Sequence, residues 1–329
     1  MPVYESPLLN IGLPPAKVIP GSYLLGLYTC LLGTDYLLLR HQLPLSKRII
    51  RTSIVAVHAA VPLYVISPLQ ANNVAFAAVP WFLASYSAYL PTEHLGWKEW
   101  IKALSSTVID SSGPAKPSES GWKVIRGVAK LAALLLLVDR LLPANPKLIF
   151  QDPYFSLPSL VNTFLFGVKA YLILGTSDIL AGIVELVSGK RIVDLFDAPF
   201  LATSPRDFWS HRWNKPVRNL LHAQVFKNHT SASSSKTGRG LLAFAVSGIF
   251  HELIIWSLFR KATFENLSFF LLHGFACMLE TRYVSSTKPK GWKRVGCILS
   301  QLGFMTLTGR LFLAPFLRSD FTQQLPLRY

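Results

Sequence analysis

Residues 241–259 read LLAFAVSGIFHELIIWSLF, and this apolar run decides the fold of the chain. A helix needs about 20 apolar residues to cross a bilayer, so the run predicts a membrane-spanning helix. Similar runs recur along almost the whole sequence. They predict eight spans, near residues 18–39, 49–69, 74–91, 127–142, 158–187, 241–259, 267–284 and 295–317. The run at 158–187 is long enough for a helix that is steeply tilted or broken.

The composition supports a membrane setting. Of the 329 residues, 51% are hydrophobic and only 15% are charged, and the mean hydropathy is +0.36. This balance is too apolar for an ordinary soluble domain. No hydrophilic block is large enough to fold alone, so we expect one integral domain over residues 1–329. The predicted fold class is all-α, a polytopic membrane helix bundle.

Basic residues are divided unequally between alternate loops. In the eight-span layout, 23 of the 33 lysines and arginines lie in loops on one side and seven in loops on the other; the 188–240 loop alone carries nine. Because basic loops stay in the cytosol, this loop is predicted to be cytosolic, in a protein of the endoplasmic reticulum membrane. The same rule accounts for most of the formal charge of +16. No nucleic-acid-binding module accompanies the charge, so nucleic acid is not expected as a partner.

An aromatic and basic segment, SPRDFWSHRWN, occupies residues 204–214. Ser204 is suited to be a helix N-cap because a proline follows it, and Pro216 limits the far end, so a short helix is predicted here. On such a helix Trp209 and Trp213 are four residues apart and share a face. Taken alone, the segment is typical of an anchor at the level of the lipid headgroups.

His251 lies midway along the apolar run at 241–259. An ionisable side chain at that depth is costly and normally faces a cavity or a partner. Gly248, one turn earlier, leaves room for a ligand or a neighbouring helix. Glu252 projects about 100° away around the helix, so its position alone does not imply a hydrogen bond to His251. A hydrogen-bonded structural histidine is the default for a lone case.

The segment that ends at Asn214 and the His-Glu pair 37 residues later form two linked motifs. Together they resemble the signature of the membrane-bound O-acyltransferases, in their wax-synthase-like branch, over roughly the C-terminal half of the chain. The compact size is similar to that of fungal members that acetylate secondary metabolites. The resemblance implies tilted helices around a central tunnel, with coenzyme A entering from the cytosol and a lipophilic alcohol reaching His251 from the bilayer.

The resemblance also implies the chemistry: an acyl group, with acetyl favoured, passes from acyl-CoA to the hydroxyl of a lipophilic molecule such as a terpenoid. His251 is then the general base, because a neutral imidazole with a pKa near about 6.5 is suited to take the hydroxyl proton. Asn214 supplies an amide donor to the thioester carbonyl or to a substrate hydroxyl. Acyl-CoA is a co-substrate rather than a bound cofactor. No metal is expected, because the remaining histidines lack ligand-like spacing.

Further side chains are assigned to the two substrates. Those expected to contact the coenzyme A thioester lie in the basic loop: Trp209, Arg212, Trp213, Lys215 and Arg218. Asp178 and Glu252, two acidic residues within apolar runs, are expected along the substrate channel. The alternative for the arginines is contact with anionic lipid headgroups.

Other functions stay open on the sequence alone. A long-chain wax-ester or sterol-ester synthase would use the same residues with a different acyl donor. A membrane terpene cyclase would use an intramembrane acid such as Asp178 or Glu280 to protonate a polyene. A small transporter would line a pathway with buried charges. For His58 and His273 the sequence favours helix–helix hydrogen bonds over a role in lining a pore.

Overall fold

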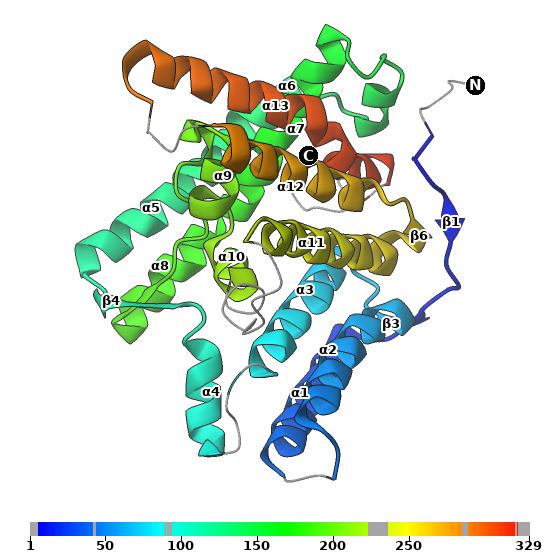
Figure 1. The fold of residues 1–329 in the computed structure, drawn as a ribbon, viewed down its shortest axis with the longest axis vertical. Helices are drawn as coiled ribbons and strands as arrows, with labels where there is room; N and C mark the ends of the chain where they lie inside the picture. The colour runs from blue at the N-terminus through cyan, green and yellow to red at the C-terminus, as the bar shows by residue number, and fades with distance from the viewer. Residues whose placement is uncertain are drawn as a thin grey trace.

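The computed structural model describes residues 6–41, 44–88, 90, 94–222, 236–284, 289–319 and 321. The described chain is a bundle of helices with three short two-stranded sheets (Figure 1). β1 (Ile11–Gly12) pairs antiparallel with β6 (Lys261–Ala262), β2 (Lys17–Val18) pairs parallel with β3 (Val65–Ile66), and β4 (Ile109–Pro114) pairs antiparallel with β5 (Lys190–Ile192). These strand pairs connect segments that lie outside the helices, close to the helix ends.

A helix stands at each of the eight predicted spans. They are α1 (Gly21–Arg40), α2 (Lys47–Tyr64), α3 (Gln70–Ser87), α5 (Pro117–Ala133) with the π-helical turn η2 (Leu134–Val138) and α6 (Asp139–Leu141), α7 (Leu157–Gly175) with α8 (Ser177–Ser188), α11 (Lys236–Phe259), α12 (Glu265–Tyr283) and α13 (Gly291–Arg318). Within the described ranges, four stretches are long and apolar enough to cross a membrane: Gly21–Arg40, Leu157–Ser188, Gly238–Phe259 and Gly291–Arg318. The count of eight spans and the central tunnel stay predictions.

The long apolar run at 158–187 is broken, as one of the two sequence alternatives predicted. α7 and α8 meet at Thr176. There the hydroxyl of Thr176 donates to the Ile173 carbonyl at 2.6 Å and that of Ser177 donates to the Leu174 carbonyl at 2.7 Å. Such side-chain bonds compete with the helical backbone ladder, which bends the helix.

The helix at the predicted span 127–142 begins at Pro117, ten residues before the start of that span. The extra turns carry cations that are paired with carboxylates of α8. These turns are helical, but their charge kept them out of the predicted span. The two helices approach very closely. A Cβ added to Gly182 would lie 2.6 Å from Val124 and 2.8 Å from the Ser120 carbonyl, and one added to Gly127 would lie 2.6 Å from Ile179.

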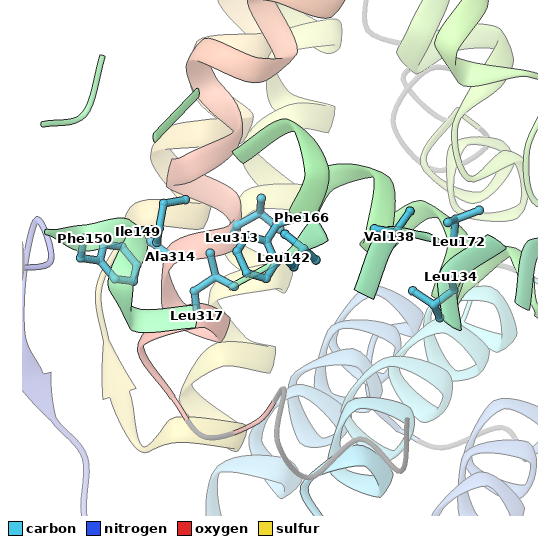
Figure 2. Packing of buried hydrophobic residues seen from close by; sticks show 10 residues of the cluster. All are labelled: Leu134, Val138, Leu142, Ile149, Phe150, Phe166, Leu172, Leu313, Ala314 and Leu317. Carbon is cyan, nitrogen blue, oxygen red and sulfur yellow. The ribbon is translucent and has the colours of Figure 1, made fainter. Parts of the chain in front are cut away.

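Among the described residues, the two largest of four hydrophobic clusters join helices of the bundle that are far apart in the sequence. The first joins η2, the 3-10 turn η3 (Pro146–Phe150), α7 and α13 (Figure 2). Its buried members are Leu134, Val138, Leu142, Ile149, Phe150, Phe166, Leu172, Leu313, Ala314 and Leu317. The second core joins α3, α11 and α10 (Lys215–Leu221), through residues that include Trp81, Phe250 and Leu220. The short helices α4 (Trp97–Ser105) and η4 (Pro199–Leu201) lie in connections.

Helices α11, α12 and α13 position the two sequence motifs. α11 and α12 pack at glycines: a Cβ on Gly248 would lie 2.8 Å from Leu267, and one on Gly274 would lie 2.9 Å from Phe244. The space beside Gly248 therefore takes a neighbouring helix. α12 and α13 run antiparallel, because early residues of α12 contact late residues of α13: Glu265 accepts a hydrogen bond from Arg318, and Asn266 donates to the Phe312 carbonyl.

Candidate active site

The segment 204–221 forms two short helices. The first is α9 (Pro205–Asp207), which continues into the π-helical turn η5 (Phe208–Arg212), and the second is α10. Ser204 caps the first helix as predicted, since its hydroxyl accepts a hydrogen bond from the Asp207 N–H at 3.1 Å. The predicted continuous helix up to Pro216 is wrong. The chain leaves the helix at Trp213, and Pro216 lies in the first turn of α10.

This break separates the two tryptophans, so the prediction that they share a helix face is wrong. Trp213 is extended, with φ −103° and ψ 131°, and packs on Phe196 and Phe208. Trp209 packs on Phe270 at 5.4 Å between ring centroids. Trp209 therefore faces α12, whereas Trp213 closes the turn that precedes Asn214.

Asn214 stands at the junction of the two helices in a left-handed conformation, with φ 43° and ψ 61°. Asparagine tolerates this conformation better than most residues. Its Oδ1 accepts a hydrogen bond from the Val217 N–H at 3.4 Å, so the side chain caps α10. This bond uses the amide oxygen and leaves the Nδ2 amide group, a donor, without a hydrogen-bond partner among the described residues. Asn214 can thus serve as a cap and still offer a donor to a ligand.

Trp209 begins a string of hydrogen bonds through the bundle. Its indole N–H donates to His273 Nδ1 at 3.0 Å, the Nε2 of His273 lies 2.9 Å from the Thr308 hydroxyl, and Thr308 donates to the Phe304 carbonyl at 2.8 Å. Because the indole only donates, His273 must carry its proton on Nε2. His273 therefore makes helix–helix hydrogen bonds, as predicted. His58 does the same, with its Nε2 2.9 Å from an Asp35 carboxylate oxygen on α1.

His251 has a defined tautomer. Its Nδ1 lies 2.8 Å from the Ser247 carbonyl, one turn earlier in α11. A carbonyl can only accept, so Nδ1 carries the proton and Nε2 carries the lone pair. Nε2 has no hydrogen-bond partner among the described residues. The ring packs against Phe270 at 4.4 Å and Phe312 at 5.6 Å between centroids. The arrangement leaves a basic nitrogen available in apolar surroundings.

The two motifs are joined through shared neighbours. Phe270 contacts both Trp209 and His251. Leu220 of α10 lies in the same core as Phe250, the residue before His251. Among the described residues no hydrogen bond links Asn214 directly to His251. A reacting group would therefore have to lie between these side chains for both to act on it.

Glu252 is a helix cap that the sequence did not predict. It is 2% exposed, and its carboxylate accepts hydrogen bonds from the backbone N–H groups of Asn266 at 2.8 Å, Leu267 at 3.1 Å and Phe264 at 3.2 Å. These are orphan donors at the start of α12, where a negative charge is also favoured by the helix dipole. Glu252 and His251 form no hydrogen bond with each other. A role for Glu252 in a substrate channel stays a prediction.

Asp178 lies in an ion-pair network between α5 and α8. Its carboxylate accepts from Arg126 at 2.8 Å and from Lys130 at 2.7 Å, and Arg126 also bonds to Asp194 at 2.7 Å. The carboxylate is paired with two cations inside the chain, an arrangement that does not suit it to protonate a polyene. Glu280 is likewise engaged, because it accepts from the Ser204 hydroxyl at 2.7 Å and from a backbone N–H of α9 at 2.8 Å. A channel role for Asp178 stays a prediction.

The side chains predicted to hold coenzyme A differ in how free they are. Arg212 is engaged inside the chain, since it donates to Asp207 at 2.9 Å and to the Asp197 and Ala198 carbonyls. Burial alone would raise the pKa of the Asp207 carboxyl, but hydrogen bonds from the Thr203 N–H and from Arg212 hold that pKa below its ordinary value. Lys215 and Arg218 lie closer to solvent, Lys215 at 3.9 Å from an Asp197 oxygen and Arg218 exposed.

A polar cavity of about 390 Å³ lies beside the ion-pair network. Its lining has equal numbers of basic and acidic side chains, and it also includes Trp122. It includes none of the residues predicted for catalysis or donor binding. Across the described part of the chain, no group of three or more His, Cys, Asp or Glu side chains is arranged to hold a metal ion.

Residues 192–272 match the family described as membrane bound O-acyl transferase. The chain is 34% identical over 174 residues to the probable long-chain-alcohol O-fatty-acyltransferase 1 of Arabidopsis thaliana, which covers 50% of this chain and 51% of that protein. It is 32% identical over 176 residues to the long-chain-alcohol O-fatty-acyltransferase of Simmondsia chinensis, which covers 49% of each chain.

The resemblance to the wax-synthase-like membrane-bound O-acyltransferases is confirmed. The acyl-CoA–sterol O-acyltransferase 1 of Arabidopsis thaliana is also similar, with 30% identity over 182 residues, 51% of this chain and 52% of that protein. The chain thus spans about half the length of the curated relatives it matches. The matched range contains both motifs that carry the resemblance: the segment that ends at Asn214 and the apolar run that contains His251.

The sequence did not reveal the partners of the buried polar groups at this candidate site. The string from Trp209 to Thr308 and the cap made by Glu252 join residues that are far apart in the chain. One signal was available for Thr308: it is a polar residue within an apolar run, so it needed a hydrogen-bond partner.

Proposed function

We propose that this chain is a membrane O-acyltransferase that moves an acyl group from acyl-CoA to the hydroxyl of a lipophilic alcohol. One observation carries the proposal: His251, inside the range that matches the family, has its Nδ1 proton fixed on the Ser247 carbonyl and its Nε2 without a hydrogen-bond partner among the described residues. A general base needs such a nitrogen.

The proposed reaction is a direct transfer. Nε2 of His251 takes the proton of the alcohol while the alcohol oxygen attacks the thioester carbonyl. The Nδ2 amide group of Asn214 donates a hydrogen bond to the oxyanion that forms. The carbon–sulfur bond then breaks, and the proton passes from His251 to the departing thiolate. The products are an ester and free coenzyme A, and no residue of the chain becomes acylated.

The names of the similar proteins support a fatty-acyl donor and a long-chain alcohol or a sterol as acceptor. Acetyl transfer to a terpenoid, which the resemblance to compact fungal family members implies, stays an alternative within the same reaction. The two differ in the donor accepted, so acetyl-CoA and palmitoyl-CoA distinguish them when each is offered with a long-chain alcohol, a sterol and a terpenoid alcohol.

The test is release of free thiol by purified protein in lipid nanodiscs. The unmodified protein should consume an acyl-CoA only when an alcohol is present. His251→Ala should lower the rate by at least about 10²-fold, the usual contribution of a general base. His41→Ala, which changes an exposed histidine outside the site, is the matched control and should keep the rate. Substantial turnover by a folded His251→Ala protein would remove the base from the mechanism.

A cyclase is disfavoured by the hydrogen-bond donors that occupy Asp178 and Glu280. The same assay separates the two functions, because a cyclase would convert a polyene without any thioester. Conversion of a polyene by this protein with no dependence on acyl-CoA would refute the O-acyltransferase proposal.

A further inference from the structure

Gln301 of α13 is a buried amide that the proposed mechanism does not use. The residue is 3% exposed. Both of its polar atoms, Oε1 and Nε2, are buried without a hydrogen-bond partner among the described residues, and within that part of the chain it is the one side chain with two such atoms. Buried polar groups are nearly always hydrogen-bonded, so an amide with neither its donor nor its acceptor used requires an explanation.

The position of Gln301 relates it to the candidate active site. Residues 7 and 11 positions later on a helix return to within about 20° of the same face. These residues are Thr308, which bonds to His273, and Phe312, which packs on His251. Gln301 therefore belongs to the face of α13 that contacts α12 and the site. The rise of about 1.5 Å per residue places it about 16 Å along the helix from Phe312.

The antiparallel pairing of α12 and α13 shows which segment lies at the level of Gln301. His273 bonds to Thr308, and Gln301 lies seven residues before Thr308, so the matching position on α12 is seven residues after His273. That position is Glu280, which holds the start of α9 through its bonds to Ser204 and to the Arg206 N–H. Gln301 thus lies at the end of the site where α9 begins. α9 is the start of the basic segment that is predicted to bind the acyl donor.

We propose that Gln301 binds the pantetheine arm of the acyl donor, with its amide paired to the amide farther from the sulfur. The inference rests on the proposed function. An amide side chain matches this group because each can both donate and accept a hydrogen bond. The amide nearer the sulfur is only two carbons from it, so it would lie close to His251, whereas Gln301 is about three turns away. Because Gln301 is buried, the arm reaches it when neighbouring side chains change rotamer.

The experiment replaces Gln301 with methionine, which has a similar size and no amide. Leu302→Met, on the next position of the same helix, is the matched control. Removing an unpartnered buried amide should leave the thermal midpoint equal or higher. Free coenzyme A and pantetheine should each raise the midpoint of the unmodified protein and of Leu302→Met, and should raise that of Gln301→Met much less. This binding measurement does not require that the protein catalyse any reaction.

Enzyme kinetics provide a second, independent test. A contact made equally in the ground and transition states changes KM, so Gln301→Met should raise KM for acyl-CoA about tenfold and leave KM for the alcohol unchanged. The same penalty should appear with an acyl-pantetheine. It should vanish with an acyl thioester of N-acetylcysteamine, which lacks the farther amide.

Several results would overturn the inference. A lower thermal midpoint for Gln301→Met would mean that the amide is bonded within the protein. A raised KM for the alcohol would place it at the acceptor. An equal penalty with all three donors, or none with any, would exclude the pantetheine arm. If the protein binds coenzyme A through Gln301 but transfers no acyl group, the proposed function fails while this binding residue stands.

Discussion

Replacement of Asn214 separates its two possible roles, because Oδ1 caps α10 and Nδ2 is the expected oxyanion donor. Asn214→Asp keeps an oxygen for the Val217 N–H and keeps a residue that tolerates φ 43°, but it removes the amide donor. Asn214→Gly accepts the left-handed conformation without strain and, as an N-cap, costs only a few tenths of a kcal/mol. Both variants should therefore fold and lack the donor.

Asn214→Ala should behave differently. It loses the cap, which costs about 0.5 to 2 kcal/mol. It also puts alanine in a left-handed conformation that costs an ordinary residue about 1 to 2 kcal/mol and that asparagine tolerates better. Its lower thermal midpoint would mix a folding effect with a catalytic one. The Asp and Gly variants avoid this confusion.

The expected loss of kcat for the Asp and Gly variants is about 10²- to 10³-fold, the usual effect of removing one oxyanion donor. The assay is thiol release at saturating acyl-CoA and alcohol, with the thermal midpoint measured on the same preparations. Near-normal kcat in Asn214→Asp, together with a low midpoint for Asn214→Ala, would mean that Asn214 only caps the helix. The reasoning that assigns it a donor role would then be refuted.

Three further outcomes are expected. Trp209→Phe keeps a ring but leaves its histidine partner without a donor, so unfolding free energy should fall by about 1 to 3 kcal/mol, seen as a lower thermal midpoint, whereas an unchanged midpoint would show the indole bond to be dispensable. The pKa of Asp207 is held below its ordinary value, so the stability that this carboxylate contributes is fully present above the ordinary pKa and is lost as the pH falls through the lowered pKa. Asp207→Asn should therefore flatten this part of the curve of stability against pH. An unchanged curve would contradict the contribution of Asp207. Gly182→Ala should lower the thermal midpoint because its methyl group would meet α5 at 2.6 Å, while Gly167→Ala, with nothing within 4 Å, should be tolerated; equal effects would refute the close-packing argument.

The helices and the cap at Ser204 could be predicted because both depend on neighbouring residues. An apolar run of about 20 residues has few alternatives in a bilayer. Ser204 likewise meets the Asp207 N–H only three residues away. The position of His251 within a helix follows from the same run. These parts of the fold and of the site needed no knowledge of distant contacts.

The break at Trp213 could not be predicted, because distant backbone contacts stabilise it. The Arg212 carbonyl accepts from the Asp197 N–H at 2.8 Å, and the Lys215 N–H donates to the Leu195 carbonyl at 3.2 Å. These bonds take the chain out of the helix that the local sequence favours. The partners of Asp178 and Glu252 were missed for the same reason, since their hydrogen-bond donors come from other helices or from the next helix's start.

The string from Trp209 through His273 to Thr308 also determines where protons can travel. A proton wire needs each member to accept a proton on one side and release one on the other, and an indole N–H cannot accept. The string therefore ends at Trp209 and conducts no proton between the bundle interior and the basic loop. Under the proposed mechanism, a proton taken by His251 stays beside the reacting atoms and has the departing thiolate as its destination, so ester formation would draw no proton through this part of the bundle.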